Sequence, residues 1–294
     1  MVLILVIVAL ALLAAGVSFA LTSAPNVDAD LIDPVVQEQA VRRSIRHHPR
    51  VQLYLQQRLD RTTAGGFMIT VAFAVMFTSA LFIGVILAII DNSAAVQRAD
   101  RAVSAWGSDH ATAASIDAIE FVTQLGSTWF VTLLLVAVAT FDYARRRNPE
   151  VFLFVLAVGL GELVLNNAIK VIVHRDRPDV LQLVGVGGFS FPSGHSAAAA
   201  AAWSAAALVL GRGRPRHVRA ALGAVAALVA IAVASSRALL GVHWLTDVIA
   251  GLALGWGWFI LVAVVFGGRA QRLGDPAARI ALGVNDDEHD RVAP

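Results

Sequence analysis

Seven apolar runs constrain the fold of this chain more than any other feature of its sequence. They cover residues 2–21, 67–90, 128–141, 151–173, 197–210, 220–235 and 248–266. A helix that crosses a bilayer needs about 20 mostly apolar residues, and only helices and closed barrels satisfy the backbone in lipid. Charged residues make up 15% of the chain, against about 25% in soluble domains. The sequence therefore predicts an all-α fold, a polytopic membrane helical bundle.

The polar segments between these runs divide the chain into four parts. We expect an N-terminal transmembrane helix at 1–22, a basic cytoplasmic or interfacial segment at 23–66, a six-helix membrane domain at 67–267, and a polar, disordered cytoplasmic tail at 268–294. No positive charge precedes the first apolar run, as it would in a signal peptide, so this helix is expected to be retained. The basic segment fits either a helix on the membrane surface or a solvated linker. Residues 91–127 are expected to form a long loop, in which Ser115 could cap a short helix through Phe121.

The distribution of basic residues predicts the orientation of the chain in the membrane. Most of the 23 Lys and Arg residues fall in 23–66, 142–150, 211–219 and the tail, all on one side of the predicted bundle. The positive-inside rule makes that side cytoplasmic. Placement in short inter-helix loops also argues against nucleic acid as a partner. The chain has no cysteine, which excludes disulfides and thiolate metal sites.

Three short polar stretches, at 170–178, 192–195 and 236–247, lie on the opposite, extracytoplasmic side of this topology. Lys170, the only lysine in the chain, shares a predicted helix face with Glu162 and Asn166. Ionisable groups at membrane depth are costly and are functional candidates by default. If the helix continues to Pro178, Arg177 joins the same face.

The basic side chains of these stretches suit a phosphate group. Lys170, Arg177 and Arg237 would converge as cations, and guanidinium groups match the geometry of phosphate oxygens. Arg175 either adds to this set or anchors the chain at the membrane interface, and both interpretations stay open.

The second and third stretches contain candidate catalytic groups. Ser193 is a plausible N-cap of the following helix, whose free N–H groups, beginning at Gly194, would attract an anion. His243 and Asp247 are four residues apart, so the carboxylate could orient the imidazole and leave its other nitrogen as nucleophile or base. Taken alone, the first pattern also fits an ordinary cap beside the loop histidine His195, and the second fits a structural histidine.

An alternative interpretation is a metal site, whose possible ligands would be His174, His195, His243 and Asp247. The neighbouring cations would repel a divalent ion, and Asp247 is the only clear carboxylate ligand. We therefore expect neither a metal nor another cofactor.

Taken together, the stretches resemble a known signature. They consist of Lys170 with Arg177-Pro178, then Pro192-Ser193-Gly194-His195, then Ser236-Arg237 with His243 and Asp247. This spacing is similar to the three-part signature of the type 2 phosphatidic acid phosphatase superfamily, and the resemblance covers about residues 67–266. It implies a six-helix phosphatase core to which the N-terminal helix is an addition.

The resemblance also implies a role for each signature residue. His243 would attack phosphorus, Asp247 would orient it, and His195 would protonate the leaving oxygen and later activate water. The phosphoryl oxygens would be held by Lys170, Arg177, Ser193, Gly194 and Arg237.

We therefore expect a metal-independent lipid phosphatase, with its active site at the outer face of a bacterial plasma membrane and a lipid phosphate in the bilayer as substrate. An outward site fits undecaprenyl or decaprenyl diphosphate, while phosphatidic acid and phosphatidylglycerophosphate are alternatives. A lipid phosphotransferase with the same fold also stays open. A lipid binder with a relic site and a soluble vanadate-dependent haloperoxidase are disfavoured by the intact signature and the apolar runs. Nothing in the sequence predicts the oligomeric state.

Overall fold

The computed structural model describes residues 2–23, 90, 92–179 and 187–269, and its regular elements there are all helical. They are α1 (Val2–Ser23), α5 (Ala94–Asp109), α6 (Ala113–Gln124), α7 (Thr128–Arg146), α8 (Glu150–Val173), α9 (Gly194–Gly211), α10 (Arg216–Leu239) and α11 (Leu245–Arg269). The predicted all-α membrane fold is confirmed. The predicted 67–90 helix, the 23–66 segment and nearly all of the 268–294 tail lie outside the described residues.

Five of the described helices are long and apolar enough to cross a membrane, namely α1, α7, α8, α10 and α11. The predicted run 197–210 lies in α9, which is not among them. Alanine dominates α9, and Ala197, Ala200 and Ala205 are fully buried. Small side chains let neighbouring backbones approach closely, so α9 is buried by protein rather than by lipid.

Residues 91–127 were expected to form mostly a loop, and this expectation is wrong. They contain α5 and α6, each begun by a side-chain cap. The Ser93 hydroxyl accepts from the Val96 N–H. At α6 the cap is Thr112, and Ser115 is its partner three residues later in a capping box. Such caps satisfy N–H groups that a helix start leaves free, so these polar sequences form helices without a long apolar run.

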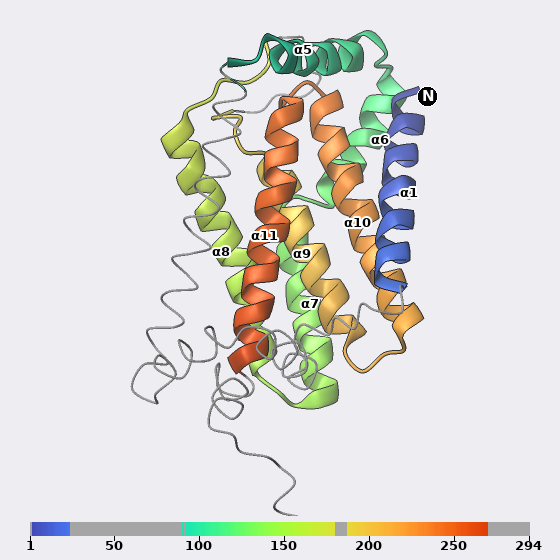
Figure 1. Cartoon of the computed structure of the whole chain (residues 1–294), viewed down its shortest axis with the longest axis vertical. Helices are drawn as coiled ribbons and strands as arrows, with labels where there is room; N and C mark the ends of the chain where they lie inside the picture. Colours follow the sequence, from blue (N-terminus) through green and yellow to red (C-terminus); the bar gives the residue numbers. More distant parts are fainter. Residues whose placement is uncertain (1, 24–89, 91, 180–186, 270–294) are drawn as a thin grey trace, which may run out of the picture. The chain divides into compact units, whose positions relative to one another are not determined.

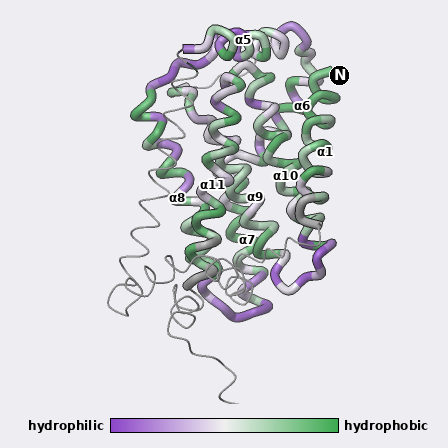
Figure 2. The backbone as a smooth tube through the Cα atoms, viewed as in Figure 1, coloured by the Kyte–Doolittle hydropathy of each residue, from purple (hydrophilic) through white to green (hydrophobic). Residues whose placement is uncertain are grey.

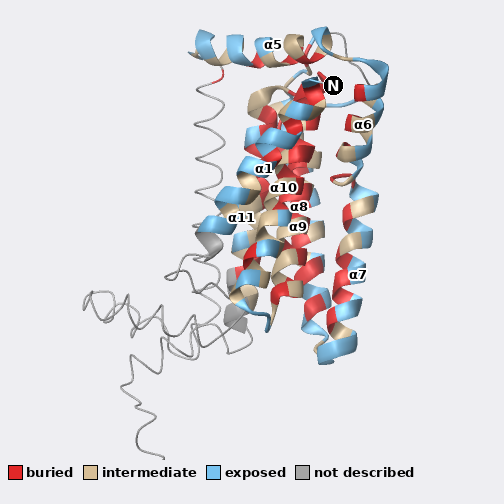
Figure 3. Cartoon of the chain, turned by 90° about the vertical axis from the view of Figure 1, so that its right-hand side faces the viewer, coloured by how far each residue is buried: buried red, intermediate tan, exposed pale blue. Residues whose placement is uncertain are grey.

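The chain divides into two compact units, and the helices belong to the first, residues 1–27 with 79–262. The second, residues 28–78 with 263–294, contains only the last turns of α11 among the described residues. Within the first unit, α9 packs against α7, α8 and α10, and α1 packs along α10. Figure 1 shows α5 crossing one end of α10. Buried residues concentrate on α9 and α10, whereas the outer faces of α1, α5 and α7 are exposed (Figure 3).

The two ends of this helix set carry different chemistry. At one end, Arg212 and Arg146 both pair with Asp142, at 3.0 and 3.1 Å. At the other end the three polar stretches meet beneath α5. Figure 2 shows hydrophilic segments at both ends and apolar helices between them. For the described arginine-rich loops at 142–150 and 211–219, the expected separation from the signature residues is therefore present.

Candidate active site

Backbone contacts bring the three polar stretches into one place. The Ser193 N–H donates to the Asp247 carbonyl at 3.0 Å, which joins the start of α9 to the start of α11. The Ser190 N–H donates to the Arg175 carbonyl at 2.8 Å, and Trp244 Nε1 donates to the Asp176 carbonyl at 2.9 Å. Segments distant in sequence therefore form one polar centre.

Two glycines on α11 allow this centre to form. A Cβ atom at Gly251 would lie 2.5 Å from the Ser193 carbonyl oxygen, and one at Gly255 would lie 2.2 Å from that of Ala197. Any larger residue would push the helices apart. The first turn of α9 is thus seated directly on α11.

The cations of the centre come from α8, from α10 and from the irregular chain that follows α8. The Lys170 ammonium, near the end of α8, donates to the Phe189 carbonyl at 2.8 Å. The side chain of Arg237, on α10, is 5% exposed and donates to the Thr123 hydroxyl at 3.4 Å. Its Nε atom has no hydrogen-bond partner among the described residues. These contacts leave donor capacity for an anionic ligand.

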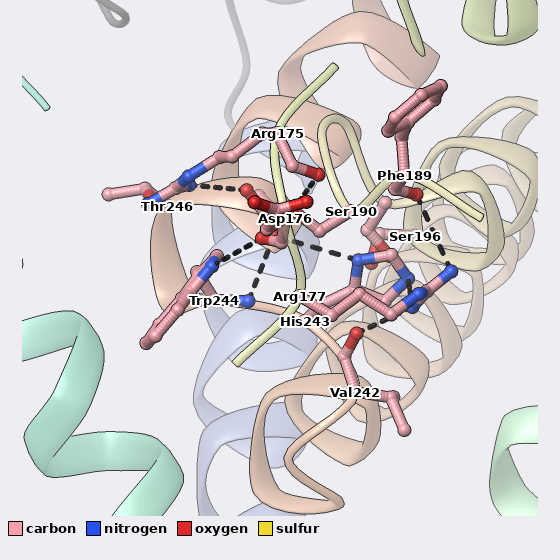
Figure 4. A network of polar contacts seen from close by, with 12 residues as sticks. Arg175, Asp176, Arg177, Phe189, Ser190, Ser196, Val242, His243, Trp244 and Thr246 are labelled. Carbon is pink, nitrogen blue, oxygen red and sulfur yellow. Dashed lines mark hydrogen bonds and ion pairs between the residues drawn. The ribbon is translucent and has the colours of Figure 1, made fainter. Parts of the chain in front are cut away.

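Arg177 does not share a helix face with Lys170, so that expectation is wrong. α8 ends at Val173, because His174 adopts a left-handed conformation with φ of 51°. Arg177 follows in irregular chain and donates to the carbonyls of Gly187, Gly188 and Val242 at 2.9, 2.9 and 2.6 Å. Its Nη1 lies 3.4 Å from His243 Nε2. Figure 4 shows Arg177 beside the His243 ring.

The start of α9 matches the prediction in position but not in its cap bond. Ser193 occupies the N-cap position, but its side chain makes no capping hydrogen bond. Instead its Oγ accepts from the Ser196 hydroxyl at 2.9 Å. Asn166 lies close to this turn, since a Cβ at Gly194 would be 3.3 Å from the Asn166 Oδ1. Asn166, one of the three residues of the predicted polar face of α8, therefore lies beside the start of α9.

His243 and Asp247 are both almost inaccessible, at 2% and 0% exposure. The Asp247 Oδ2 accepts from the Trp244 N–H at 2.9 Å and lies 3.7 Å from His243 Nδ1. That separation is longer than a hydrogen bond. Burial lowers the pKa of His243 to about 4, and the charges of Arg237 and Arg177 act in the same direction against the opposing Asp247. The ring is therefore neutral at pH 7 and able to act as a nucleophile.

His195 lies in the same electrostatic environment. Burial lowers the pKa of His195 to about 3, and the charges of Arg237, His243, Lys170 and Arg177 act in the same direction. His174, by contrast, packs its ring edge-on against Phe189 at 4.4 Å. The structure thus gathers the predicted histidines and cations and leaves His174 in a packing contact.

Three residues of this centre were missed or left open by the sequence. Arg175 had been left between two interpretations, and Asp100 and Thr246 had not been considered. Arg175 donates to both Asp100 and Asp247, and Thr246 donates to Asp100. The sequence contained a signal for Arg175 alone, because it lies within the first polar stretch. It contained none for Asp100, which belongs to a segment expected to be a loop.

Comparison with known proteins decides the family. Residues 150–270 match the PAP2 superfamily. The chain is 34% identical over 180 residues to phosphatidylglycerophosphatase B of Bacillus subtilis, covering 60% of this chain and 88% of that protein. The chain belongs to the PAP2 superfamily. The resemblance found in the sequence is confirmed. The protein is a PAP2-class phosphatase, a hydrolase of lipid phosphates in the membrane.

Other relatives show how widely this superfamily varies. The crystal structure of a transmembrane PAP2-type phosphatidylglycerolphosphate phosphatase from Bacillus subtilis superposes with a TM-score of 0.61 at 32% identity, covering 67% of this chain and 97% of that one. Decaprenylphosphoryl-5-phosphoribose phosphatase of Mycobacterium tuberculosis is 35% identical over 150 residues, 48% of this chain and 73% of that protein. Lipid A 1-phosphatase of Rhizobium etli is 36% identical over 126 residues, 39% of this chain and 49% of that protein, so the chain spans about half its length.

Proposed function

We propose that this PAP2 phosphatase removes a terminal phosphate from a membrane lipid at the extracytoplasmic face, without a metal, through a phosphohistidine on His243. The observation that carries the proposal is the placement of the His243 ring. Its Nε2 lies 3.4 Å from Arg177 Nη1, while its Nδ1 faces Asp247 at 3.7 Å. One nitrogen thus borders the cations and the other borders the carboxylate that would stabilise the charged ring.

The reaction has two displacement steps. In the first, the Nε2 lone pair forms a bond to phosphorus while the bond from phosphorus to the lipid oxygen breaks. His195 gives that oxygen a proton, which the ring takes up when the anionic substrate binds among the cations that otherwise keep it neutral. In the second, His195 takes a proton from water, whose oxygen attacks phosphorus and breaks the bond to Nε2. Inorganic phosphate leaves, and both histidines return to their starting states.

The surrounding cations supply the electrostatic part of catalysis. Lys170, Arg177 and Arg237, with the Ser193 hydroxyl and the Gly194 N–H, would hold the phosphoryl oxygens. Phosphoryl transfer depends mostly on such positioning and charge stabilisation, and a single donor of this kind contributes about 10²–10³-fold in rate. Metal independence is proposed because these cations occupy the centre. The described residues also contain no group of three or more possible metal ligands.

Phosphatidylglycerophosphate is the first substrate to test. It is the substrate class named for the Bacillus subtilis relative, which this chain covers over 88% of its length. The polyprenyl diphosphates expected from the sequence remain candidates, as does phosphatidic acid. Transfer of the phosphoryl group to an alcohol is the alternative reaction, because the same intermediate would serve it.

The test is phosphate release by the purified protein from a panel of these lipids in detergent, with excess chelator and no added alcohol. We expect release that vanadate inhibits competitively, and loss of at least about 10³-fold in His243→Gln. That variant should retain the thermal transition of the unaltered protein. Near-normal turnover in His243→Gln would exclude this nucleophile. Activity that disappears in chelator and returns with a divalent metal would exclude the metal-free mechanism.

A further inference from the structure

We infer that Asp100 and Arg175, with Thr246, form a clamp that fixes the Asp247 carboxylate and thereby the His243 ring. The effect of this clamp on catalysis rests on the proposed function, whereas the contacts that form the clamp do not depend on it. Neither Asp100 nor Thr246 belongs to the signature. They are positioning residues, because they act on the nucleophile through Asp247.

Asp100 is a carboxylate that α5 holds inside the protein. It is 2% exposed. Its Oδ1 accepts from the Thr246 N–H at 2.9 Å, and its Oδ2 accepts from the Thr246 hydroxyl at 2.7 Å and from Arg175 Nη2 at 2.8 Å. Both oxygens are therefore engaged, and two of the three donors belong to the first turn of α11.

The start of α11 needs such a partner. The first N–H groups of a helix have no acceptor within it, and a Ser, Thr, Asp or Asn just before the helix usually supplies one. Here the preceding residue is Trp244, whose indole can only donate. Asp100 supplies the missing acceptor from another helix, and its negative charge also suits the positive end of the α11 dipole. The position of α11 near the site is thus set by α5.

Arg175 connects this cap to the catalytic carboxylate. Its Nη1 donates to Asp247 Oδ1 and to the Thr246 hydroxyl, while Nη2 holds Asp100. The guanidinium also lies over the Trp244 ring, 5.5 Å from its centroid. Figure 4 shows Arg175 reaching Thr246 on the side of the chain away from Arg177 and His243.

The result is a carboxylate that cannot rotate. Arg175 occupies Asp247 Oδ1, and the Trp244 N–H occupies Oδ2, which is the oxygen facing His243 Nδ1. Two fixed hydrogen bonds thus determine where the negative charge sits beside the nucleophile. A misplacement of about 1 Å at a reacting group can cost about 10²-fold in rate, so losing the clamp should slow the chemical step more than binding.

The experiment compares Asp100→Asn, Arg175→Gln, Arg175→Lys and the double variant Asp100→Asn/Arg175→Gln with one matched control. The control is Asp142→Asn. Like Asp100→Asn, it removes the charge of a buried carboxylate that is paired with arginine, but Asp142 and its partners Arg146 and Arg212 lie at the other end of the helices. Measurements are kcat and KM for the best lipid substrate, single-turnover phosphoenzyme formation, thermal transition, and the ¹⁵N resonances of the His243 ring.

We expect Asp100→Asn and Arg175→Gln each to lower kcat and single-turnover rate by about 10–100-fold, with KM within about threefold. The double variant should be no slower than the slower single one, because both act through Asp247. Arg175→Lys should recover part of the rate, since one ammonium cannot bridge two carboxylates as the guanidinium does. The His243 ring resonances should move in the clamp variants but not in Asp142→Asn, whose kcat should stay unchanged whatever its thermal transition does.

Unchanged kcat in the clamp variants would overturn the inference. So would kcat losses that only follow a lowered thermal transition and that Asp142→Asn shows as well. Single losses that multiply in the double variant would overturn it as well. Absence of phosphate release by the unaltered protein from every lipid would instead count against the proposed function. In that case the histidine resonances still decide whether the clamp positions His243.

Discussion

At the scale of single residues, the neutral state of His243 follows from where its ring is placed. The ring is 2% exposed, and its Nδ1 has no hydrogen-bond partner among the described residues. Charging it there would require an imidazolium without water and next to arginines. Folding therefore disfavours protonation, which keeps a lone pair available for the attack on phosphorus that we propose.

We predict that the His243 ring titrates near pH 4 in the folded protein instead of at its ordinary pKa of 6.5. A ¹⁵N-labelled histidine spectrum of the free protein in detergent, assigned with His243→Gln, should show a neutral ring at pH 6. Since the folded pKa is the lower one, this group contributes stability above about pH 6.5 and loses it as the pH falls toward 4. A titration midpoint at or above 6.5 would contradict the prediction.

At the scale of elements, the contact between α9 and α11 depends on glycines, which have no side chain to separate the two helices. α11 meets the first turn of α9 at Gly251, where a Cβ would lie 2.5 Å from a backbone oxygen. Backbone atoms cannot rotate away as a flexible side chain can. The geometry of the Ser193-Gly194 turn is therefore coupled to the residue at position 251.

We predict that Gly251→Ala destabilises the protein by about 1–3 kcal/mol, as overpacking commonly does, and lowers kcat by displacing Ser193. Gly257→Ala is the matched control on the same helix, because nothing lies within 4 Å of its Cβ position. Alanine is the better helix former, so the control should be neutral or slightly stabilising. Thermal transitions and kinetics of the two variants should separate clearly, and equal behaviour would contradict this view of the contact.

α1 supports the segment that carries His243. Leu3, Ile7 and Ala11 are buried in one cluster with Leu240 and Val242. Residues four apart lie on one helix face, so a single stripe of α1 makes this contact and the rest of the helix is free to face lipid. Val242 directly precedes His243 and holds Arg177 through its carbonyl.

We predict that Ile7→Ala, which truncates a side chain 4% exposed, lowers stability by about 1–3 kcal/mol. Leu13→Ala, at a site 66% exposed on the same helix, should change little. Thermal unfolding in detergent compares the two. A larger effect of Leu13→Ala would mean that the other face of α1 makes the important contact.

At the scale of the whole molecule, the signature residues and the arginine-rich loops lie at opposite ends of the described helices. From the positive-inside rule we propose that the loop at 211–216 is cytoplasmic and that α5 is extracytoplasmic. Membership of the superfamily shows a multi-pass membrane protein but leaves this orientation as a proposal.

Single cysteines test the orientation directly, since the chain contains none of its own. Arg101→Cys on α5 and Arg214→Cys in the arginine-rich loop both replace exposed residues. We expect a membrane-impermeant maleimide to label Arg101→Cys in intact spheroplasts and Arg214→Cys only after lysis. The reverse pattern would place the active site on the cytoplasmic side.

The sequence by itself determined the helical class, the family and the signature residues that gather at the centre. Apolar runs and motif spacing are local properties, and they located α7, α8, α10 and α11 to within about five residues at each end. Local patterns gave weaker signals in the polar segments, which show no long apolar period. The left-handed turn at His174 and α5 were missed, and the short helix expected to begin at Ser115 begins instead at Ala113 with Thr112 as its cap.

Only the tertiary structure decided which groups hold His243 and Asp247 in place. The acceptor for the first turn of α11 is Asp100, a residue 146 positions earlier in the chain. No spacing rule connects two such residues, because their contact depends on how α5 lies across the ends of other helices. The same distance in sequence concealed the role of Arg175, whose two carboxylate partners meet only after the chain has folded.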